Sequence, residues 1–273
     1  MKFRKVYLLI LLIPIVVWFF NRESYLKVAF LDVGQGDAIY IETPDGRQML
    51  IDGGADYQIL NQLSKIMPFG DRSIDVVLAT HPDTDHIGGL VDVLNNYSVG
   101  VFIENGAEAN NRAYANLKEI IVNRVIAKRG MRIILEDDIY FDILFPDRDI
   151  SDLDSNDSSI VGKLVYEDIS FMLTGDATVY TEIILHNYGN LKSNVLKVGH
   201  HGAKTSSSLL FLQDVDPEYG IISAGLNNRY KHPHQDVLDK LKKLKINILS
   251  TFEQGNIIFK TNGQELFYNP GFF

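Results

Sequence analysis

Short apolar runs alternate with amphipathic segments from residue 25 to residue 273, and this pattern predicts one mixed α/β domain. Each half is rich in strands first and alternates strands with helices afterwards, which fits two sheets packed face to face with helices outside. The predicted strands cover residues 25–31, 38–43, 48–52, 74–80, 131–136, 139–146, 159–166, 169–174, 194–198, 246–251, 256–261 and 264–268. The predicted helices cover residues 56–67, 110–128, 178–188, 206–213 and 235–244, and one more begins near residue 90.

Residues 1–24 follow a different pattern. Lys2, Arg4 and Lys5 precede an uncharged apolar run over residues 6–20, in which Pro14 is the exception. A helix of that length spans about 22 Å, less than the roughly 30 Å of bilayer hydrocarbon, but flanking basic and aromatic side chains can extend it. No small-x-small cleavage pattern follows, so the segment predicts a membrane anchor or an uncleaved signal. A buried core helix is the alternative.

The basic residues before this segment predict that the N-terminus lies inside the cell. The domain would then be extracytoplasmic on a single-pass membrane protein, or secreted if the segment is cleaved. The composition, 46% hydrophobic and 22% charged, is ordinary for a globular protein. The net charge of −9 disfavours broad coating of DNA, so any contact with nucleic acid must be local. The absence of cysteine excludes disulfides and thiolate metal sites.

The densest polar cluster follows the predicted strand at residues 74–80. His81, Asp83, Asp85 and His86 lie within six positions, and helical spacing resumes directly after them. Alternation along an extended segment turns the first three side chains to one side, and the helix start brings His86 back to it. Imidazole and carboxylate together suit zinc, manganese or iron, so this segment predicts a site for one or two divalent ions. The alternative, a solvated turn, rarely gathers four such residues between a strand and a helix.

These four residues form a His-x-Asp-x-Asp-His motif, which resembles the His-x-His-x-Asp-His motif of the metallo-β-lactamase superfamily with Asp83 in place of the second histidine. With Leu-Asp-Val-Gly-Gln-Gly-Asp-Ala at residues 31–38 and Gly-His-His-Gly at residues 199–202, the chain resembles the metallo-hydrolase domain of the ComEC competence proteins over about residues 26–268. The resemblance implies an α+β fold, the αββα four-layer sandwich. It also implies a metal-dependent phosphodiesterase or nuclease that degrades one DNA strand during uptake.

Three further residues are implied as site residues by this resemblance. Asp176, at the end of a predicted strand, would bridge two metal ions, although an aspartate there often only caps the next helix. Either histidine of the Gly-His-His-Gly motif could be a metal ligand, and His200 is the favoured one. His201 would then act in acid/base chemistry or contact phosphate.

A polar segment after these histidines leads into a predicted helix. Its backbone amides, its hydroxyls and Lys204 suit an anion, so Lys204 and Ser206 are predicted phosphate contacts, with plain helix capping by Ser206 as the alternative. His232 is implied as a metal ligand in place of His200 or as a phosphate contact. His234 is a weaker candidate for the same role. The alternative for both residues is that they only mark the start of the next helix.

Asn156 stands where the superfamily usually has a third histidine for the first metal ion. That ion keeps His81, Asp83 and Asp176 as strong ligands, so the site should be rich in oxygen and should favour manganese over zinc. Asp37 is expected at the rim of the site, although a purely turn-forming role for its Gly-Gln-Gly-Asp motif is equally compatible with the sequence.

The predicted reaction uses Asp85 to hold the second metal ion and to orient the attacking water, while His201 or His232 assists the leaving oxygen. The predicted substrate is single-stranded DNA. The alternatives are hydrolysis of a small ester, lactone or phosphodiester, and a metal-stabilised binding module without turnover. A groove flanked by basic residues would favour nucleic acid, and a narrow apolar pocket would favour a small ester; the basic candidates are Lys197, Lys204, Arg229 and Lys231.

Overall fold

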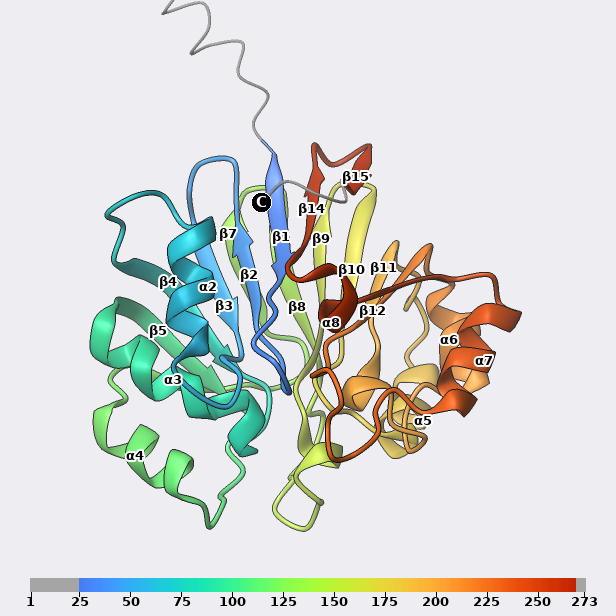
Figure 1. The fold of residues 1–273 in the computed structure, drawn as a ribbon, viewed down its shortest axis with the longest axis horizontal. Coiled ribbons are helices and arrows are strands. Elements are labelled where there is room, and N and C mark those ends of the chain that lie inside the picture. The colour runs from blue at the N-terminus through green and yellow to red at the C-terminus, as the bar shows by residue number, and fades with distance from the viewer. Residues whose placement is uncertain (1–24, 269–273) are drawn as a thin grey trace, which may run out of the picture.

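Two β-sheets pack face to face, and helices cover the outer surface of each sheet (Figure 1). This computed structural model describes residues 25–268, so the predicted anchor over residues 1–24 lies outside the described part. Within residues 25–268, none of the helices is long and apolar enough to cross a lipid bilayer. The layers are those of the predicted αββα sandwich.

The first sheet has the strand order β15-β14-β1-β2-β3-β4-β5-β6. It is antiparallel from β15 to β3 and parallel from β3 to β6. Its strands are β1 (Leu26–Phe30), β2 (Ile39–Glu42), β3 (Gln48–Ile51), β4 (Ser73–Ala79), β5 (Ser98–Glu104), β6 (Arg124–Ile126), β14 (Ile257–Thr261) and β15 (Leu266–Tyr268). The helices α2 (Gln58–Ile66), α3 (Thr84–Asn96) and α4 (Arg112–Ile120) lie on its outer side (Figure 1).

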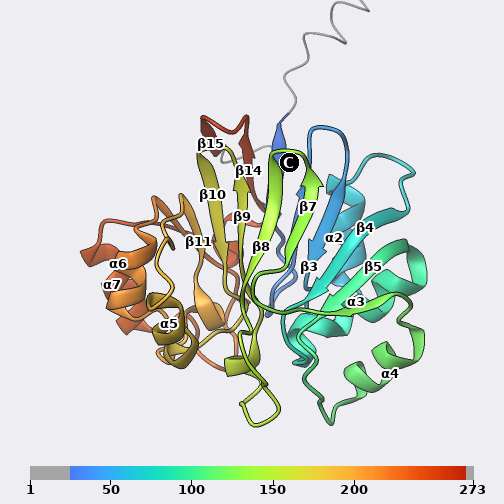
Figure 2. The ribbon, with the colours of Figure 1, turned by 180° about the vertical axis from the view of Figure 1, so that it is seen from behind.

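The second sheet has the order β13-β12-β11-β10-β9-β8-β7. Its strands are parallel from β13 to β10 and antiparallel from β10 to β7. Its strands are β7 (Arg132–Glu136), β8 (Ile139–Phe145), β9 (Val161–Tyr166), β10 (Ile169–Leu173), β11 (Val195–Lys197), β12 (Tyr219–Ile222) and β13 (Asn247–Ser250). Its outer side carries α5 (Val179–His186), α6 (Leu209–Val215) and α7 (Gln235–Lys243), as seen from behind in Figure 2. Shorter elements are η1 (Asn156–Ser158), η2 (Gly199–Gly202) and α8 (Thr251–Gln254).

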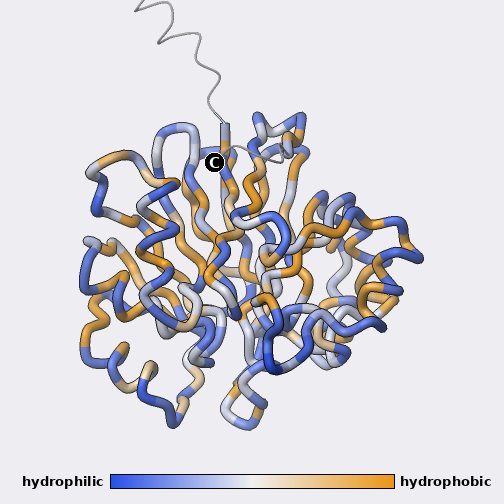
Figure 3. The backbone as a smooth tube through the Cα atoms, viewed as in Figure 1, coloured by the Kyte–Doolittle hydropathy of each residue, from blue (hydrophilic) through white to orange (hydrophobic). Residues whose placement is uncertain are grey.

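Apolar side chains fill three layers of core, one between the sheets and one beneath each set of helices. Between the sheets, the rings of Phe30 and Phe171 both pack edge-on against Phe259, at centroid distances of 6.2 and 6.0 Å. Figure 3 shows the apolar stretches following the strands. On β8 the inward residues are buried and the alternate ones are partly exposed, as the sequence pattern predicts for a strand with one core face.

The predicted helix over residues 110–128 is wrong in its second half. The helix ends at Ile120, and Arg124–Ile126 forms β6, paired in parallel with β5. Ile121 has an extended backbone (φ −65°, ψ 128°) that ends the helix, and the left-handed Asn123 (φ 55°) directly precedes β6, where Val125 packs against the core between the sheets. Two strands with apolar runs, β5 and β12, were not among the predicted elements. Both are interior strands of their sheets.

Candidate metal centre

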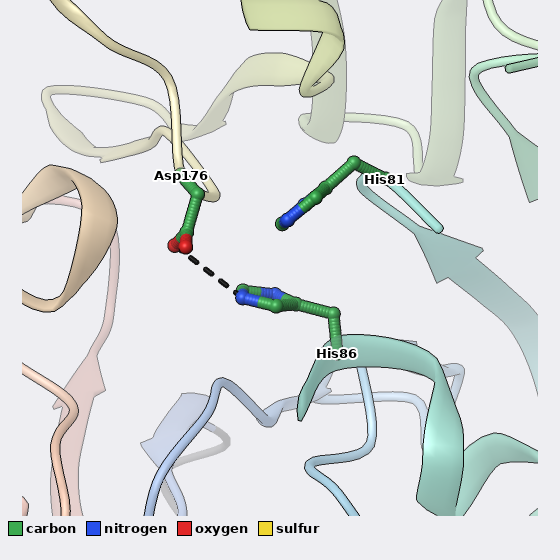
Figure 4. Close-up of side chains that lie close together, drawn as sticks. All are labelled: His81, His86 and Asp176. Atoms are coloured by element: carbon green, nitrogen blue, oxygen red, sulfur yellow. Dashed lines mark ion pairs between the residues drawn. The ribbon is translucent and has the colours of Figure 1, made fainter. Parts of the chain in front are cut away.

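Side chains from the ends of both sheets converge on one buried point. His81 follows β4, His86 lies in the first turn of α3, and Asp176 follows β10. Figure 4 shows the two rings and the carboxylate turned toward one another, and their ligand atoms all lie within 4.8 Å. Asp85, His86 and His201 form a second such group, which shares His86 with the first. The arrangement offers two adjacent sets of metal ligands.

The facing atoms in this cluster lack hydrogen-bond partners. They are Nε2 of His81, His86 and His201 and Oδ1 of Asp176, all buried. Buried polar atoms in native proteins are nearly always satisfied, and each exception calls for an explanation. A divalent cation would satisfy nitrogen and carboxylate atoms together. The residues present therefore fit a metal ion.

Hydrogen bonds on the far side of each ring fix which nitrogen faces the cluster. Thr80 donates its hydroxyl proton to Asp52, so Nδ1 of His81 donates to the Thr80 oxygen, 3.0 Å away. Nδ1 of His86 donates to Asp52 at 2.7 Å, and Nδ1 of His201 donates to the Ser223 carbonyl at 2.8 Å. With every Nδ1 carrying the proton, each Nε2 presents its lone pair to the cluster. Such outer hydrogen bonds are what orient metal-ligating histidines in proteins.

Asp52 is a functional residue that the sequence analysis missed. It directly follows β3, is fully buried, and has a left-handed backbone (φ 58°) that turns its carboxylate toward α3. The carboxylate also accepts the backbone N–H of Thr80 at 2.8 Å. The available signal was an aspartate at the carboxyl end of a buried strand, followed by Gly53-Gly54.

In the turn η2 the backbone is left-handed at both His200 and His201 (φ 48° and 53°). The two side chains therefore leave the turn in different directions. Non-glycine residues in that region are strained by about 1–3 kcal/mol each, and such strain clusters at functional sites. Nε2 of His201, which is buried, lies 3.3 Å from Asp176 and 3.5 Å from Asp85. The half-buried His200 lies 3.8 Å from Asp176, and its Nδ1 contacts the Thr205 hydroxyl. The geometry therefore favours His201 as the ligand, the reverse of the sequence-based ranking.

Asp37 lies behind His201 and not at the rim of the site. Its carboxylate is buried, 2.6 Å from Nζ of Lys197 and 3.3 Å from Nδ1 of His201. Burial alone would raise the pKa of Asp37, but Lys197 and His201 hold it below its usual value. Lys197 is fully buried in this pair, so it cannot line a groove for nucleic acid as the sequence analysis supposed.

Asp176 does not cap a helix. Thr178 is the cap of α5, where its hydroxyl accepts the Tyr180 N–H, while Asp176 points into the cluster. Burial alone would raise the pKa of Asp176, but His201 and His86 hold it well below its usual value. A charged carboxylate between two imidazole rings is the geometry that a bridging ligand needs.

Asp83 and Asp85 lie on opposite margins of the cluster. Asp83 accepts a hydrogen bond from the Ser155 hydroxyl at 2.6 Å, and its other oxygen lies 3.6 Å from Nε2 of His81. Burial opposes the charged form of Asp85, but the neighbouring His201 and His86 rings lower its pKa, and the pKa of Asp83 is lowered as well, chiefly by His81. Both carboxylates are therefore ionised and available to a cation at neutral pH.

Residues 31–226 match the family described as the metallo-beta-lactamase superfamily. This chain belongs to that superfamily. The ComE operon protein 3 of Bacillus subtilis (strain 168) is 31% identical over 258 residues, which cover 86% of this chain and 33% of that protein. Competence protein ComA of Neisseria gonorrhoeae is 32% identical over 248 residues, which cover 87% of this chain and 32% of ComA. The chain thus spans about a third of the length of these curated relatives.

Among solved structures, Igni18, a metallo hydrolase from the archaeon Ignicoccus hospitalis KIN4/I, matches with a TM-score of 0.57. The identity is 16%, and the match covers 88% of this chain and 100% of that one. This structure and the family match confirm the predicted sandwich, and the two curated relatives confirm the predicted resemblance to competence proteins. Members of the metallo-beta-lactamase superfamily are typically metal-dependent hydrolases.

Asn156 lies beside His200 at the margin of the cluster. Nδ2 of Asn156 is 3.4 Å from Nε2 of His200. Burial, and then the neighbouring histidines, lower the pKa of His200 despite the opposing charge of Asp176. His200 is therefore neutral and close to the margin that lacks a third histidine.

The predicted phosphate contacts have other partners. The Ser206 hydroxyl is buried and donates to the Gly199 and Ala203 carbonyls. The next two amides, of Ser207 and Ser208, donate to the carboxylate of Glu182 from α5, so an internal anion already occupies this turn. The cap of α6 is Ser208 and not Ser206. Lys204 remains exposed.

His232 lies over the two histidines of η2, with its ring centroid 5.5 Å from that of His200 and 6.3 Å from that of His201. Burial, and then the neighbouring histidines, lower the pKa of His232 to about 4, so the ring is neutral at pH 7. His234 precedes α7, and its Nδ1 accepts the Lys204 N–H at 3.0 Å. His234 therefore has a structural partner.

Replacing Asp52 with asparagine should lower the metal affinity by about 10- to 100-fold, because the amide loses the charge that orients His86. Titration of the chelated protein with manganese or zinc measures this change. The matched control is Asp214→Asn, which removes an equally short contact of 2.7 Å with the exposed His186, away from the cluster. Equal metal affinity in both variants would contradict the role of Asp52.

His201→Ala should lose more bound metal than His200→Ala. Of these two histidines, only His201 has its Nε2 atom buried among the other ligands. Metal content per protein, measured after dialysis against a fixed metal concentration, compares the two variants. Greater loss in His200→Ala would restore the ranking that the sequence suggested.

Proposed function

We propose that this chain is a metal-dependent phosphodiesterase that cleaves single-stranded DNA. The observation that carries the proposal is the convergence of three unsatisfied Nε2 atoms with the Asp85 and Asp176 carboxylates at the carboxyl ends of the strands. Metal ions held there would polarise a phosphoryl oxygen and lower the pKa of water. The ComEC resemblance, with its implied degradation of one strand during DNA uptake, supports DNA as the substrate.

The surroundings of the cluster also support an extended anionic substrate. Lys204, Arg229 and Lys231 are exposed near it, although the chain as a whole has a net charge of −9. A cavity of about 830 Å³ opens beyond Asn105, at the end of β5, and its lining includes both basic residues (Arg124, Lys128, Arg129 and Arg148) and the acidic Asp147 and Asp149. Arg124 and Arg148 already pair with Glu104 and Asp147, so Lys128 and Arg129 are the lining cations that could contact a phosphate backbone.

The residues take distinct roles in this proposal. His81, His86, His201, Asp83 and Asp176 would hold the metal ions. Asp85 would hold a metal ion and orient the attacking water, whose proton it could accept because its carboxylate is ionised and partly exposed. His232 and His200 lie on the open side of the cluster, where a neutral imidazole can contact the phosphate or the leaving oxygen.

The identity of the metal is part of the proposal. The first metal position, beside His81, is rich in oxygen because Asp83 and Asn156 stand where the superfamily usually has histidines. Oxygen ligands favour manganese over zinc. We therefore expect activity with manganese to at least equal activity with zinc.

The chain should cut single-stranded DNA and bis-p-nitrophenyl phosphate with manganese, and a chelator should abolish both activities. Asp85→Asn should cut turnover by about 10²-fold or more, the scale of a lost general base, without unfolding the domain. The matched control is Asp92→Asn, the same change two turns along α3 and outside both ligand groups. Turnover is measured alongside metal content and thermal unfolding.

Two outcomes would redirect the proposal. A metal-loaded protein that is inert on both substrates would favour the ester hydrolase or the binding module. Unchanged DNA cleavage in metal-loaded Asp85→Asn would remove the assigned role of that carboxylate.

We also propose that residues 1–24 anchor the chain in the cell membrane with the domain outside the cytoplasm, or precede a secreted domain if cleaved. The support is the basic cluster before the apolar run at residues 6–20. Protease added to spheroplasts that express the full chain should degrade the domain. Full protection would contradict this topology, and the mass of the mature protein shows whether residues 1–20 remain.

A further inference from the structure

The loop between β12 and α7 carries an exposed aromatic side chain beside the metal centre. Tyr230 is 44% exposed, and its neighbours Arg229 and Lys231 are exposed as well. Single exposed aromatic residues are common on protein surfaces and need no explanation by themselves. The surroundings of Tyr230 distinguish it from such a residue.

Stacked rings connect Tyr230 to the buried cluster. The Tyr230 ring lies over the His232 ring at a centroid distance of 5.6 Å and an interplanar angle of 21°. The His232 ring in turn stacks on His201 at 6.3 Å and 29°, and His201 lies 5.3 Å from His86. The Tyr230 ring is therefore the outer, partly exposed end of a ring series that starts among the metal ligands.

Hydrogen bonds hold this loop in place. The Asn228 side chain donates to the carbonyls of Gly225 and His232 and accepts the His232 N–H. Gly225 donates its N–H to Oε1 of Gln35 at 3.2 Å, which ties the loop to the segment after β1. A platform fixed in this way keeps its orientation without a bound ligand, so little ordering is needed on binding.

Cationic residues lie next to Tyr230 in the chain, and one of them contacts its ring. The Arg229 guanidinium lies over the ring, 4.6 Å from the centroid, and donates to the Tyr230 hydroxyl, and the exposed Lys231 follows directly in the sequence. Lys204 is exposed on a neighbouring turn, and its backbone N–H donates to Nδ1 of His234. An aromatic face flanked by cations is the combination that binds single-stranded nucleic acid, since bases stack on the ring while the cations contact the phosphates.

We infer that Tyr230 is a stacking platform for a base next to the scissile phosphate, and that Arg229 and Lys231 contact the adjacent phosphates. The inference rests on the proposed nuclease function and assigns the residue that recognises an unpaired base of its substrate. Stacking needs an unpaired base because the bases of a duplex are already stacked on one another. A small ester or a bare phosphodiester gains nothing from the platform.

The test uses the full chain in the Asp85→Asn background, so that little of the strand is cleaved while binding is measured. The probes are a thymidine oligonucleotide and a strand of equal length and charge that contains abasic residues in place of the thymidines. Tyr230→Leu should raise the Kd for the thymidine strand by about 5- to 100-fold, the effect of losing one base stack, and leave the Kd for the abasic strand unchanged. Tyr230→Phe should restore wild-type binding because it keeps the ring.

The matched control is Phe267→Leu, an aromatic-to-leucine change at a residue that is 43% exposed. Phe267 lies in β15, which pairs with the end of β14 next to the start of β1. That end of the sheet is opposite to the strand ends that carry the ligands. This variant should bind both strands with wild-type affinity.

Fluorescence gives a second readout that does not depend on affinity. Trp18 is the one tryptophan in the sequence, so Tyr230→Trp adds a single new emitter whose signal is obtained by subtracting the parent chain. Its emission should be quenched by the thymidine strand and unaffected by the abasic strand.

The outcomes separate this inference from the proposed function. Equal binding of both strands by Tyr230→Leu and its parent would overturn the platform, while cleavage by the chain with Asp85 intact would leave the nuclease standing. Base-dependent binding through Tyr230 in a chain that cleaves no strand would support the platform and overturn the nuclease.

Discussion

The contact between the Asp52 carboxylate and Nδ1 of His86 is the interaction on which the centre depends. It joins the end of β3 to the first turn of α3, and the same carboxylate accepts the hydroxyl and the backbone N–H of Thr80 at the end of β4. One buried charge therefore fixes three chain segments and, through Thr80, the ring of His81 as well. Without it, two imidazole rings could rotate, and their lone pairs would no longer face a common point.

The second sheet contributes through a similar arrangement. Lys197 at the end of β11 holds Asp37, which contacts His201, and the Ser223 carbonyl after β12 fixes the same ring. Each half of the sandwich thus positions its own imidazoles from behind, and Asp176 lies between the two sets. Burying an ion pair costs desolvation free energy unless its atoms are well hydrogen-bonded. So many buried charged groups are therefore expected at a functional site more than in a structural core.

The open side of the centre is built differently from its buried side. There His232 and His200 lie above the ligands, Tyr230, Arg229 and Lys231 lie further out, and the carboxylates of Asp83 and Asp85 are partly exposed at the margins. A buried cluster that could hold metal ions, beside an aromatic and basic surface, supports the proposal of a long anionic substrate that is held along its length and cut at one point.

Local patterns determined much of this protein. The alternation of strands and helices predicted two packed sheets with helices outside, and the resemblance to the ComEC domain implied the four-layer sandwich. The spacing of His81, Asp83, Asp85 and His86 predicted one edge of the centre, because it depends on neighbours in the sequence. Only the tertiary structure decided which histidine of residues 200–201 faces the cluster, where Asp37 and Lys197 lie, and that Glu182 takes the amides expected to bind phosphate. Those outcomes depend on left-handed backbone turns and on partners far away in the chain, and a one-dimensional pattern records neither.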